Sequence, residues 1–184
     1  MITKETSTRS PLHAVKTTSS YTKPAQPGEV LFQDVLNLGH IQGIGQAFLH
    51  IVVDKYSHHT FGLIDTDGNS ETAVALLKDY VLPFYQKKAL SIGFIFTDKS
   101  MIFQDSNANY YHIYLHKNSI KHEYRDSTPL LANTPIERLT HIISRNFISF
   151  ISSFPPYITV EQLQQDWSNW LNTYNIGNLR EGKR

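Results

Sequence analysis

The sequence predicts an α/β protein built on a five-stranded mixed sheet with flanking helices. Three short apolar segments rich in β-branched and aromatic residues follow one another, with links of hairpin length. Segments with helical period then alternate with two further apolar strands. Three hairpinned strands followed by alternating elements indicate a mixed sheet with helices on both faces. A chain of 184 residues suffices for one domain with a sizeable core.

The three hairpin strands are expected to begin just after Glu29. The segment "VLFQDVLNLG" (30–39) predicts the first strand, and Asp34 lies inside it. The segments "AFLHIVVDKYS" (47–57) and "TFGLIDT" (60–66) predict the second and third. Because the links between them are short, we expect these strands to form an antiparallel meander.

A helix and a buried strand are expected next. The segment 71–88 has helical period, and Ser70 is placed to cap its start. Pro83 should end or kink this helix, because proline lacks the N–H that the helix needs. The run "LSIGFIFTD" (90–98) is apolar almost throughout, as expected of a central strand covered on both faces.

The last part of the chain predicts three helices, one strand and a loop. A short helix is expected within 106–118, and the fifth strand within 120–126. Residues 127–133 predict a loop. A long helix follows over 134–154, with apolar residues at spacings of three and four, and the last helix is expected over 159–175.

Composition predicts one folded core with a polar segment at each end. Residues 1–28 are rich in Ser and Thr with little apolar periodicity, which predicts a disordered or loosely attached tail. This tail is too short and polar for a folded helix-turn-helix domain. Residues 29–176 should form the core, and 177–184 a polar C-terminal tail.

The amino-acid content excludes several classes of protein. The absence of cysteine excludes disulfide scaffolds, thiolate metal sites and cysteine nucleophiles. Lys and Arg (17) nearly balance Asp and Glu (16), so net charge does not indicate a nucleic-acid binder, and any basic surface must come from local arrangement. We find neither a run of 18 apolar residues nor a signal-peptide core, and we expect a cytoplasmic protein without membrane contact.

Three acidic residues lie at or within predicted regular elements. Asp34 lies in the first strand, Asp98 ends the fourth, and Glu137 lies in the first turn of the long helix. Carboxylates without His or Cys suit hard cations such as Mg²⁺ or Mn²⁺. Two such ions, about 3.5–4 Å apart, can activate a nucleophile and stabilise a leaving oxygen in phosphoryl transfer.

Each acid also has a structural interpretation. Glu137 completes a capping box with Thr134, and this competes with metal binding because the side chain folds back onto the backbone. Asp98 could simply end its strand. Asp34 is flanked by apolar residues, and a buried carboxylate needs a partner: a metal shared with Asp98, or an Arg or Lys.

Five short motifs occur in an order that resembles the catalytic core of retroviral-type integrases and insertion-sequence transposases. They are "PGEVLFQDVLNLG", "FLHIVVDKYSHHTFGLI", "FIFTDKS", "TPLLANTPIER" and "WSNWLNTYN", and they span about 27–175. This DDE superfamily has a ribonuclease H-like fold. The resemblance implies a DDE-type polynucleotidyl transferase that acts on DNA phosphodiesters with Mg²⁺ or Mn²⁺.

The resemblance also implies functions for individual residues. Asp34, Asp98 and Glu137 fall on the three catalytic, metal-binding acids, and Asp54 falls on a motif acid that is usually structural. Arg138 follows the third acid.

Four residues near these acids are candidates for nucleic-acid contact. Besides Arg138, they are His141 and Arg145 on the polar side of the long helix and Lys99 beside Asp98, all of which could meet DNA phosphates. Integrase-like cores commonly dimerise. Trp167 and Trp170, on the apolar face of the last helix, are expected in the core or in a subunit interface, and such an aromatic face would suit a homodimer.

Departures from the family pattern keep a second function open. Lys99 and Ser100 stand where the family has Asn–Gly, Thr134 stands where it has Gly, and apolar residues 101–103 replace a further Glu. These changes are also compatible with a catalytically degenerate integrase-like domain that serves as a DNA-contact or protein-interaction module. A ribonuclease H-type nuclease shares the metal chemistry and is a third possibility.

Overall fold

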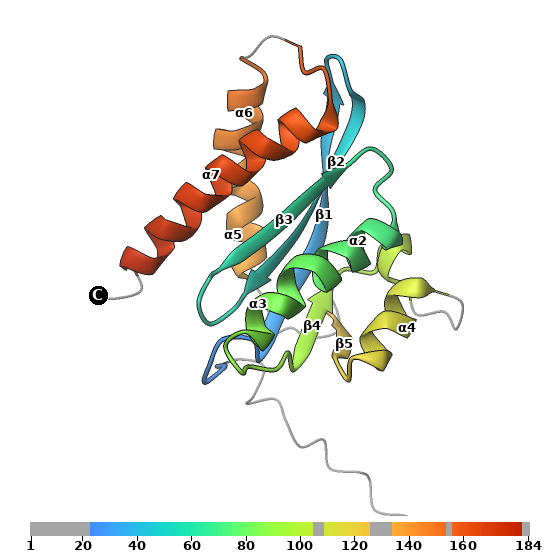
Figure 1. Cartoon of the computed structure of the whole chain (residues 1–184), viewed down its shortest axis with the longest axis vertical. Helices are drawn as coiled ribbons and strands as arrows, with labels where there is room; N and C mark the ends of the chain where they lie inside the picture. The colour runs from blue at the N-terminus through green and yellow to red at the C-terminus, as the bar shows by residue number, and fades with distance from the viewer. Residues whose placement is uncertain (1–22, 105–108, 126–133, 154–155, 182–184) are drawn as a thin grey trace, which may run out of the picture.

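The protein is built on one five-stranded mixed sheet. The structure is a computed structural model that describes residues 23–104, 109–125, 134–153 and 156–181. The strand order is β3-β2-β1-β4-β5 (Figure 1). The strands are β1 (Val30–Ile41), β2 (Gly45–Asp54), β3 (Thr60–Asp65), β4 (Phe94–Thr97) and β5 (Lys121–Tyr124).

The direction of the strands agrees with the predicted meander. Strand β2 pairs antiparallel with both β1 and β3, and β4 pairs parallel with both β1 and β5. The central strand is β1 rather than the apolar segment 90–98, of which only Phe94–Thr97 is a strand, between β1 and β5. The predicted mixed α/β sheet is therefore confirmed, with the first strand rather than the fourth at its centre.

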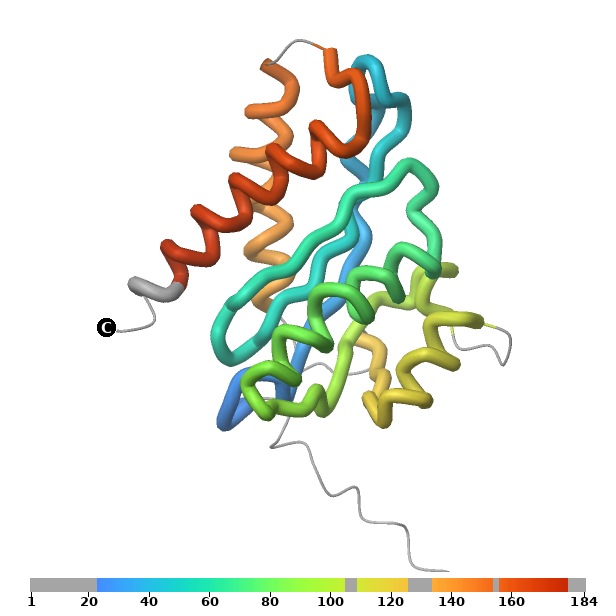
Figure 2. Tube along the Cα trace, viewed as in Figure 1, coloured from blue at the N-terminus to red at the C-terminus, as the bar shows by residue number. Residues whose placement is uncertain are grey.

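Within the described residues, two long helical runs and three further helices surround the sheet. The first run comprises α2 (Ser70–Leu76), a π-helical turn (Leu77–Val81) and α3 (Leu82–Gln86). The second comprises α5 (Pro135–Ile142), a π-helical turn (Ile143–Phe147) and α6 (Ile148–Ile151). The others are a 3₁₀ turn (Met101–Phe103), α4 (Tyr110–Lys117) and α7 (Val160–Glu181). Figure 2 shows each run as a continuous coil. The expected loop 127–133 lies outside the described residues.

The helices form one layer on each face of the sheet. Alternate residues of β1 point to opposite faces, as the two-residue period of a strand requires. Phe32 packs with the α5–α6 run and α7, whereas Leu31 packs with α2, α3 and α4. The result is a helix–sheet–helix sandwich (Figure 1). Whether a β1 residue has an even or odd number (its parity) therefore decides on which face its side chain lies.

The first helical run differs from the sequence prediction at its start, and it continues past its proline. Asn69, not Ser70, caps it: the Asn69 side chain accepts the Thr72 N–H at 2.9 Å. Pro83 neither ends nor breaks the run, which continues to Gln86. The π-helical turn before it explains this, because the Leu82 N–H donates to the Leu77 carbonyl five residues back and the wider turn accommodates the proline.

Helix α7 covers the outer edge of β3. The Asn175 amide accepts the Thr60 N–H and donates to the Thr60 carbonyl, both at 2.9 Å. The Ile64 N–H donates to Gln164 at 2.7 Å. Between them Gly62 lies under the Trp167 indole, where an added Cβ would come within 2.4 Å of Nε1. This helix runs to Glu181, beyond the end at 175 that the sequence predicts for it.

Candidate active site

Asp34, Asp98 and Arg125 lie in one row across three strands. Asp34 is in β1, whereas Asp98 and Arg125 directly follow β4 and β5. The parallel registers pair Phe32 with Phe96 and Thr97 with Tyr124. Continuing the first register by two residues places Asp34 opposite Asp98. Continuing the second by one residue places Asp98 opposite Arg125. By parity the two acids share the face of Phe32 and Phe96, under the α5–α6 run.

An ion pair crosses this row. The Arg125 guanidinium reaches Asp34 through Nη2, at 3.1 Å from Oδ2, and the side chains are 16% and 19% exposed. The Val35 N–H donates to the other Asp34 oxygen at 2.9 Å. The partner that the buried Asp34 was expected to need is therefore an arginine, supplied 91 residues later in the sequence.

The charge of Asp98 acts on the Asp34 carboxylate. Burial raises the pKa of Asp34 above its ordinary value, and the charge of Asp98 raises it further, whereas Arg125 and the Val35 N–H oppose the rise. Removal from water disfavours a carboxylate, and so does a second negative charge nearby. Asp34 and Asp98 thus form a pair of acids that would gain from additional positive charge.

Asp98 also ends its strand, as its structural interpretation predicted. One of its carboxylate oxygens accepts the Ser100 N–H at 3.1 Å, and its carbonyl accepts the Thr97 hydroxyl at 2.8 Å. These bonds hold the turn after β4. They fix the direction of the carboxylate rather than remove it from the row.

Glu137 completes the predicted capping box. Its carboxylate accepts the Thr134 N–H at 3.1 Å, and its own N–H donates to the Thr134 hydroxyl at 3.4 Å. The residue is exposed in the first turn of α5. Within the described part of the chain, no three His, Cys, Asp or Glu side chains are grouped closely enough to hold a metal ion. The structure therefore brings Asp34 and Asp98 together, whereas the Glu137 carboxylate is bonded to the backbone N–H of Thr134.

The donor atoms of the acid pair fit a hard cation. Both side chains offer only carboxylate oxygens, which are the ligands that Mg²⁺ and Mn²⁺ prefer. Repulsion between Asp34 and Asp98 would be relieved by a cation between them. Glu137 could join them only by leaving its capping interaction, because its carboxylate is committed to Thr134. Its assignment as a third ligand stays a prediction.

The candidate DNA-contacting residues are exposed, and three of them lie on the helical run that covers the acids' face of the sheet. Lys99 follows Asp98, and Arg138, His141 and Arg145 lie along α5 and its π-helical turn at spacings of three or four. Arg138 also lies near the β2–β3 turn: burial lowers the pKa of His58, and the positive charge of Arg138 lowers it further. Their contact with phosphate stays a prediction.

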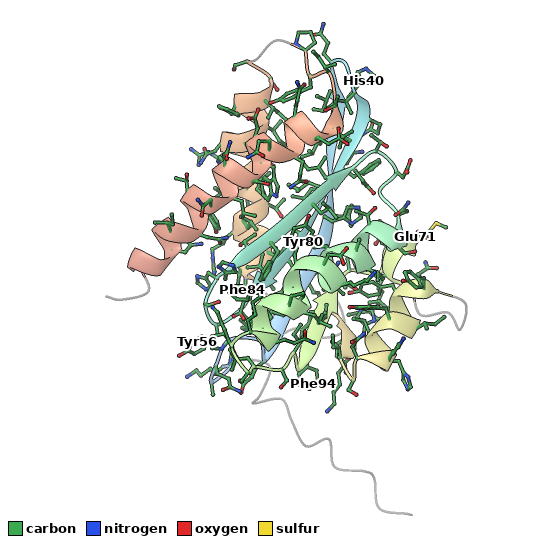
Figure 3. The ribbon with its side chains drawn as sticks, viewed as in Figure 1. His40, Tyr56, Glu71, Tyr80, Phe84 and Phe94 are labelled. Atoms are coloured by element: carbon green, nitrogen blue, oxygen red, sulfur yellow. The ribbon has the colours of Figure 1, made fainter. Side chains whose placement is uncertain are left out.

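A second acid, Asp54 at the end of β2, is held in a different way. It is fully buried, and four donors surround it: the N–H groups of Tyr56, Ser57 and Gly28 at 2.7, 2.8 and 2.6 Å, and the Tyr85 hydroxyl at 2.6 Å. Burial, with the charge of Asp54, raises the pKa of Tyr85. The Tyr56 ring itself is exposed (Figure 3). These bonds account for Asp54 as a structural acid.

Sequence reasoning missed a buried polar layer on the opposite face. His50 of β2 lies 3.3 Å from Asp65 of β3. Gln33 of β1 donates to the Ala73 carbonyl of α2 at 3.0 Å and accepts the Tyr111 hydroxyl at 2.8 Å. The available signal was a Gln and a His inside otherwise apolar strands. The partners of Gln33 come from helices α2 and α4 and that of His50 from strand β3, and no local pattern identifies them.

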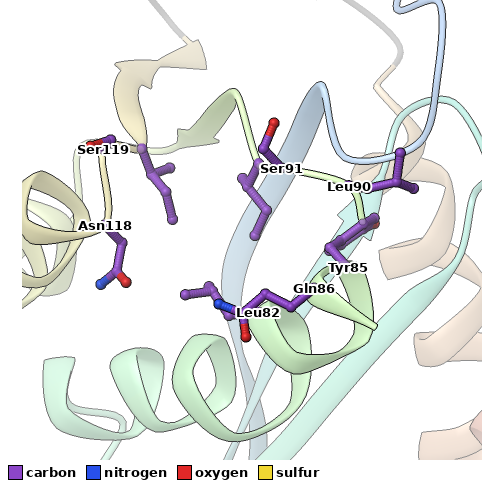
Figure 4. A pocket seen from close by; sticks show the side chains of 9 residues that line it. Leu82, Tyr85, Gln86, Leu90, Ser91, Asn118 and Ser119 are labelled. Carbon is purple, nitrogen blue, oxygen red and sulfur yellow. The ribbon is translucent and has the colours of Figure 1, made fainter. Parts of the chain in front are cut away.

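A cavity of about 400 Å³ lies at the opposite end of β4 and β5 from the acid row. Its lining includes Tyr85 and Gln86 from α3, Ile92 before β4, and Asn118 and Ser119 before β5 (Figure 4). Neutral amides and hydroxyls alternate with apolar groups there, and none of the described residues that line it is an Asp or Glu. This cavity therefore does not contribute to the acid site.

Three solved structures of similar fold are an intasome and two forms of an integrase catalytic core domain. The chain is similar to a chain of the simian T-cell lymphotropic virus intasome in complex with PP2A regulatory subunit B56 gamma, with a TM-score of 0.57 and 16% identity over 76% of this chain and 47% of that one. It thus spans about half of that intasome chain. It is also similar to the HTLV-2 integrase catalytic core domain in complex with magnesium, with TM-scores of 0.58 for the dimeric form and 0.53 for the trimeric form.

The HTLV-2 likenesses extend over most of both chains. Identity is 15% with the dimeric form, over 81% of this chain and 87% of that chain, and 14% with the trimeric form, over 85% and 86%. No protein-family model matches the sequence, and no curated protein matches it either.

These likenesses define the class of fold. The chain has the ribonuclease H-like fold of retroviral integrase catalytic cores, and the resemblance inferred from the five motifs is confirmed at the level of the fold. Among the described helices, none is both long and apolar enough to cross a membrane.

Proposed function

We propose that the chain is an integrase-like catalytic core that acts on DNA phosphodiesters with Mg²⁺ or Mn²⁺ held by Asp34 and Asp98. The observation that carries the proposal is the row across β1 and β4, which places the two carboxylates side by side on one face. The same fold occurs in the HTLV-2 integrase core in complex with magnesium. The all-oxygen donor set supports the same choice of cation.

The residues of the site would act by position and charge. Asp34 and Asp98 would hold the cation between adjacent strands, which fix both side chains. A bound divalent ion would supply the positive charge that activates an attacking oxygen and stabilises a leaving one. Glu137 would complete the site by exchanging its bond to the Thr134 N–H for a place near the acids, which costs the helix part of its cap.

The surface around the acids suits a nucleic-acid substrate. Lys99, Arg138, His141 and Arg145 are exposed and would bind DNA phosphates, positioning the backbone over the row. We also propose a homodimer through α7, where the half-buried Trp170 and Tyr174 stack at 5.3 Å between ring centres. One of the similar solved structures is a dimeric form of the HTLV-2 core.

The test is metal-dependent nicking or strand transfer on labelled DNA duplex ends. Asp34→Asn and Asp98→Asn should each lower the rate at least about a hundredfold, because each removes a ligand. Glu71→Gln is a matched control, since Glu71 is an exposed acid on the other helical layer. An RNA–DNA hybrid tested in parallel separates a transferase from a ribonuclease H-type nuclease. Activity unchanged in both Asp variants would remove the assigned site.

A second function is favoured by two contacts already described. Arg125 supplies positive charge to Asp34, and Glu137 is engaged in the capping box. Both would suit a catalytically degenerate integrase-like domain that serves as a DNA-contact or protein-interaction module. Thermal melts in millimolar Mn²⁺ distinguish the two: a rise in Tm that requires Asp34 and Asp98 supports the enzyme, and an unchanged Tm with intact DNA binding supports the module.

A further inference from the structure

The feature that carries the inference is the place of Arg125 in the acid row. Strand β5 ends at Tyr124, and Arg125 is the next residue, so its backbone is tied to the edge of the sheet. Asp34 is two strands away, with β4 between them. The side chain must therefore reach past the position of Asp98 to meet Asp34 at 3.1 Å. Arg125 thus brings its positive charge into the region where a cation shared by the two acids would lie.

A divalent ion entering the row would meet this positive charge. An arginine side chain carries a permanent positive charge in proteins, so only its movement can make room for the ion. Two positive charges beside the same carboxylate repel each other strongly in a partly buried site. Binding of the ion to Asp34 Oδ2 therefore requires Arg125 to turn away, since that oxygen is the one it holds.

The guanidinium has an alternative partner in the proposed substrate. Its contact with Asp34 is made through Nη2, and a guanidinium offers five N–H donors in a planar fork that matches a phosphate. The side chain is 16% exposed, so it lies at the boundary between the buried row and solvent. If a DNA backbone lay over the row, the Arg125 side chain could turn from Asp34 to one of its phosphates by changing its rotamer.

We propose that Arg125 occupies the cation position of the acid pair in the free protein and transfers to a DNA phosphate when substrate binds, which releases Asp34 for the metal. The inference rests on the proposed function and extends it to the order of binding. Metal and DNA then bind with positive coupling, because each favours the state in which Arg125 has left Asp34. Arg125 is a positioning and substrate-contacting residue, and no bond is made or broken through it.

The test is Mn²⁺ binding to the full chain, measured by the electron paramagnetic resonance signal of free Mn²⁺. Without DNA, Arg125→Gln should bind Mn²⁺ at least about tenfold more tightly than the wild type, since it removes the competing charge. Addition of a short DNA duplex should tighten the wild type by a similar factor and Arg125→Gln by little. Mn²⁺ bound by the duplex alone is measured and subtracted.

Two further variants control the measurement. Lys117→Gln makes the same change of charge on an exposed residue at the end of α4, and should bind Mn²⁺ as the wild type does. Arg125→Lys keeps the charge but not the planar fork. It should exclude the ion without DNA, as arginine does, and gain less when DNA is added. This variant gives a readout even if Arg125→Gln folds poorly.

The outcomes separate the inference from the function on which it rests. Equal Mn²⁺ affinity of the wild type and Arg125→Gln, without DNA, overturns the inference and leaves the metal-dependent function standing. The same gain on adding DNA for the wild type and Arg125→Gln also overturns it. Absence of Mn²⁺ binding to the wild type and to every variant, with and without DNA, overturns the proposed metal-dependent function itself.

Discussion

Asp54 and Asp34 are two acids of one sheet that are held by different kinds of hydrogen-bond donor. Asp54 ends β2 with four hydrogen-bond donors around it, three of them backbone N–H groups. Asp34 lies in β1 with the N–H of its own neighbour, one arginine and a second acid close by. Backbone donors are fixed by the fold, whereas an arginine side chain can leave. The comparison teaches that the nature of the donors, more than burial, separates a structural acid from an available one.

The largest effect should follow from removing the structural acid. Asp54→Ala leaves the N–H groups of Gly28, Tyr56 and Ser57 without their acceptor, and should lower the free energy of unfolding by about 3–5 kcal/mol. Urea unfolding measures this. Asp67→Ala, at an exposed acid, should change it by less than about 0.5 kcal/mol. A loss below about 1 kcal/mol for Asp54→Ala would contradict the structural assignment.

A smaller effect should follow from removing a single donor of the same cluster. Tyr85→Phe deletes the hydroxyl that donates to Asp54 at 2.6 Å and should cost about 2 kcal/mol, since hydrogen bonds to charged groups are the stronger ones. Tyr56→Phe makes the same chemical change on an exposed ring and should be nearly neutral. If the two variants unfold at the same urea concentration, the Tyr85 hydroxyl does not contribute as proposed.

The smallest effect, and of opposite sign, is expected at Asp34. A carboxyl whose pKa is raised by folding holds its proton more tightly in the folded state, so stability falls as the pH rises from the ordinary value of 3.8 through the raised value. Asparagine carries no charge and avoids this loss. At about pH 7 the free energy of unfolding of Asp34→Asn should therefore equal that of the wild type or exceed it by less than about 1 kcal/mol.

The pH dependence of the free energy of unfolding tests this last prediction. Unfolding is measured for both proteins from neutral pH down to below the ordinary pKa of an aspartate, where both side chains are uncharged. The difference between them should close over that interval. A variant that is clearly less stable than the wild type at neutral pH would show that the Arg125 ion pair outweighs the cost of burying Asp34, and would remove the contrast with Asp54.

Much of the fold could be predicted because its signals are local. The strand-forming residues of β1, the short links of the meander and the Thr134–Glu137 capping box each lie within a few residues, and each is found in the structure. The prediction at Ser70 was wrong by one position, because Asn69 offers an equally suitable side chain one residue earlier. Pro83 does not end its helical run because a π-helical turn precedes it, and no sequence pattern indicates that turn.

The contacts of the two acids could not be predicted in the same way. The sequence indicated that Asp34 needs a partner and that an arginine would serve, but Arg125 lies 91 residues away and reaches it across β4. The donors to Asp54 combine a turn with Gly28 and Tyr85, which lie 26 and 31 residues away. Such pairs follow from strand order and register, and these are properties of the whole fold.

The hydrogen bonds of α7 along β3 limit how copies of this chain could join. An unpaired strand edge normally invites a strand from another molecule. Here the amides of Gln164 and Asn175 already occupy that position, and the Trp167 ring lies against Gly62. An incoming strand would first have to peel this helix from the sheet. Self-association that leaves the fold intact must therefore join side-chain surfaces at this edge and cannot extend the sheet there.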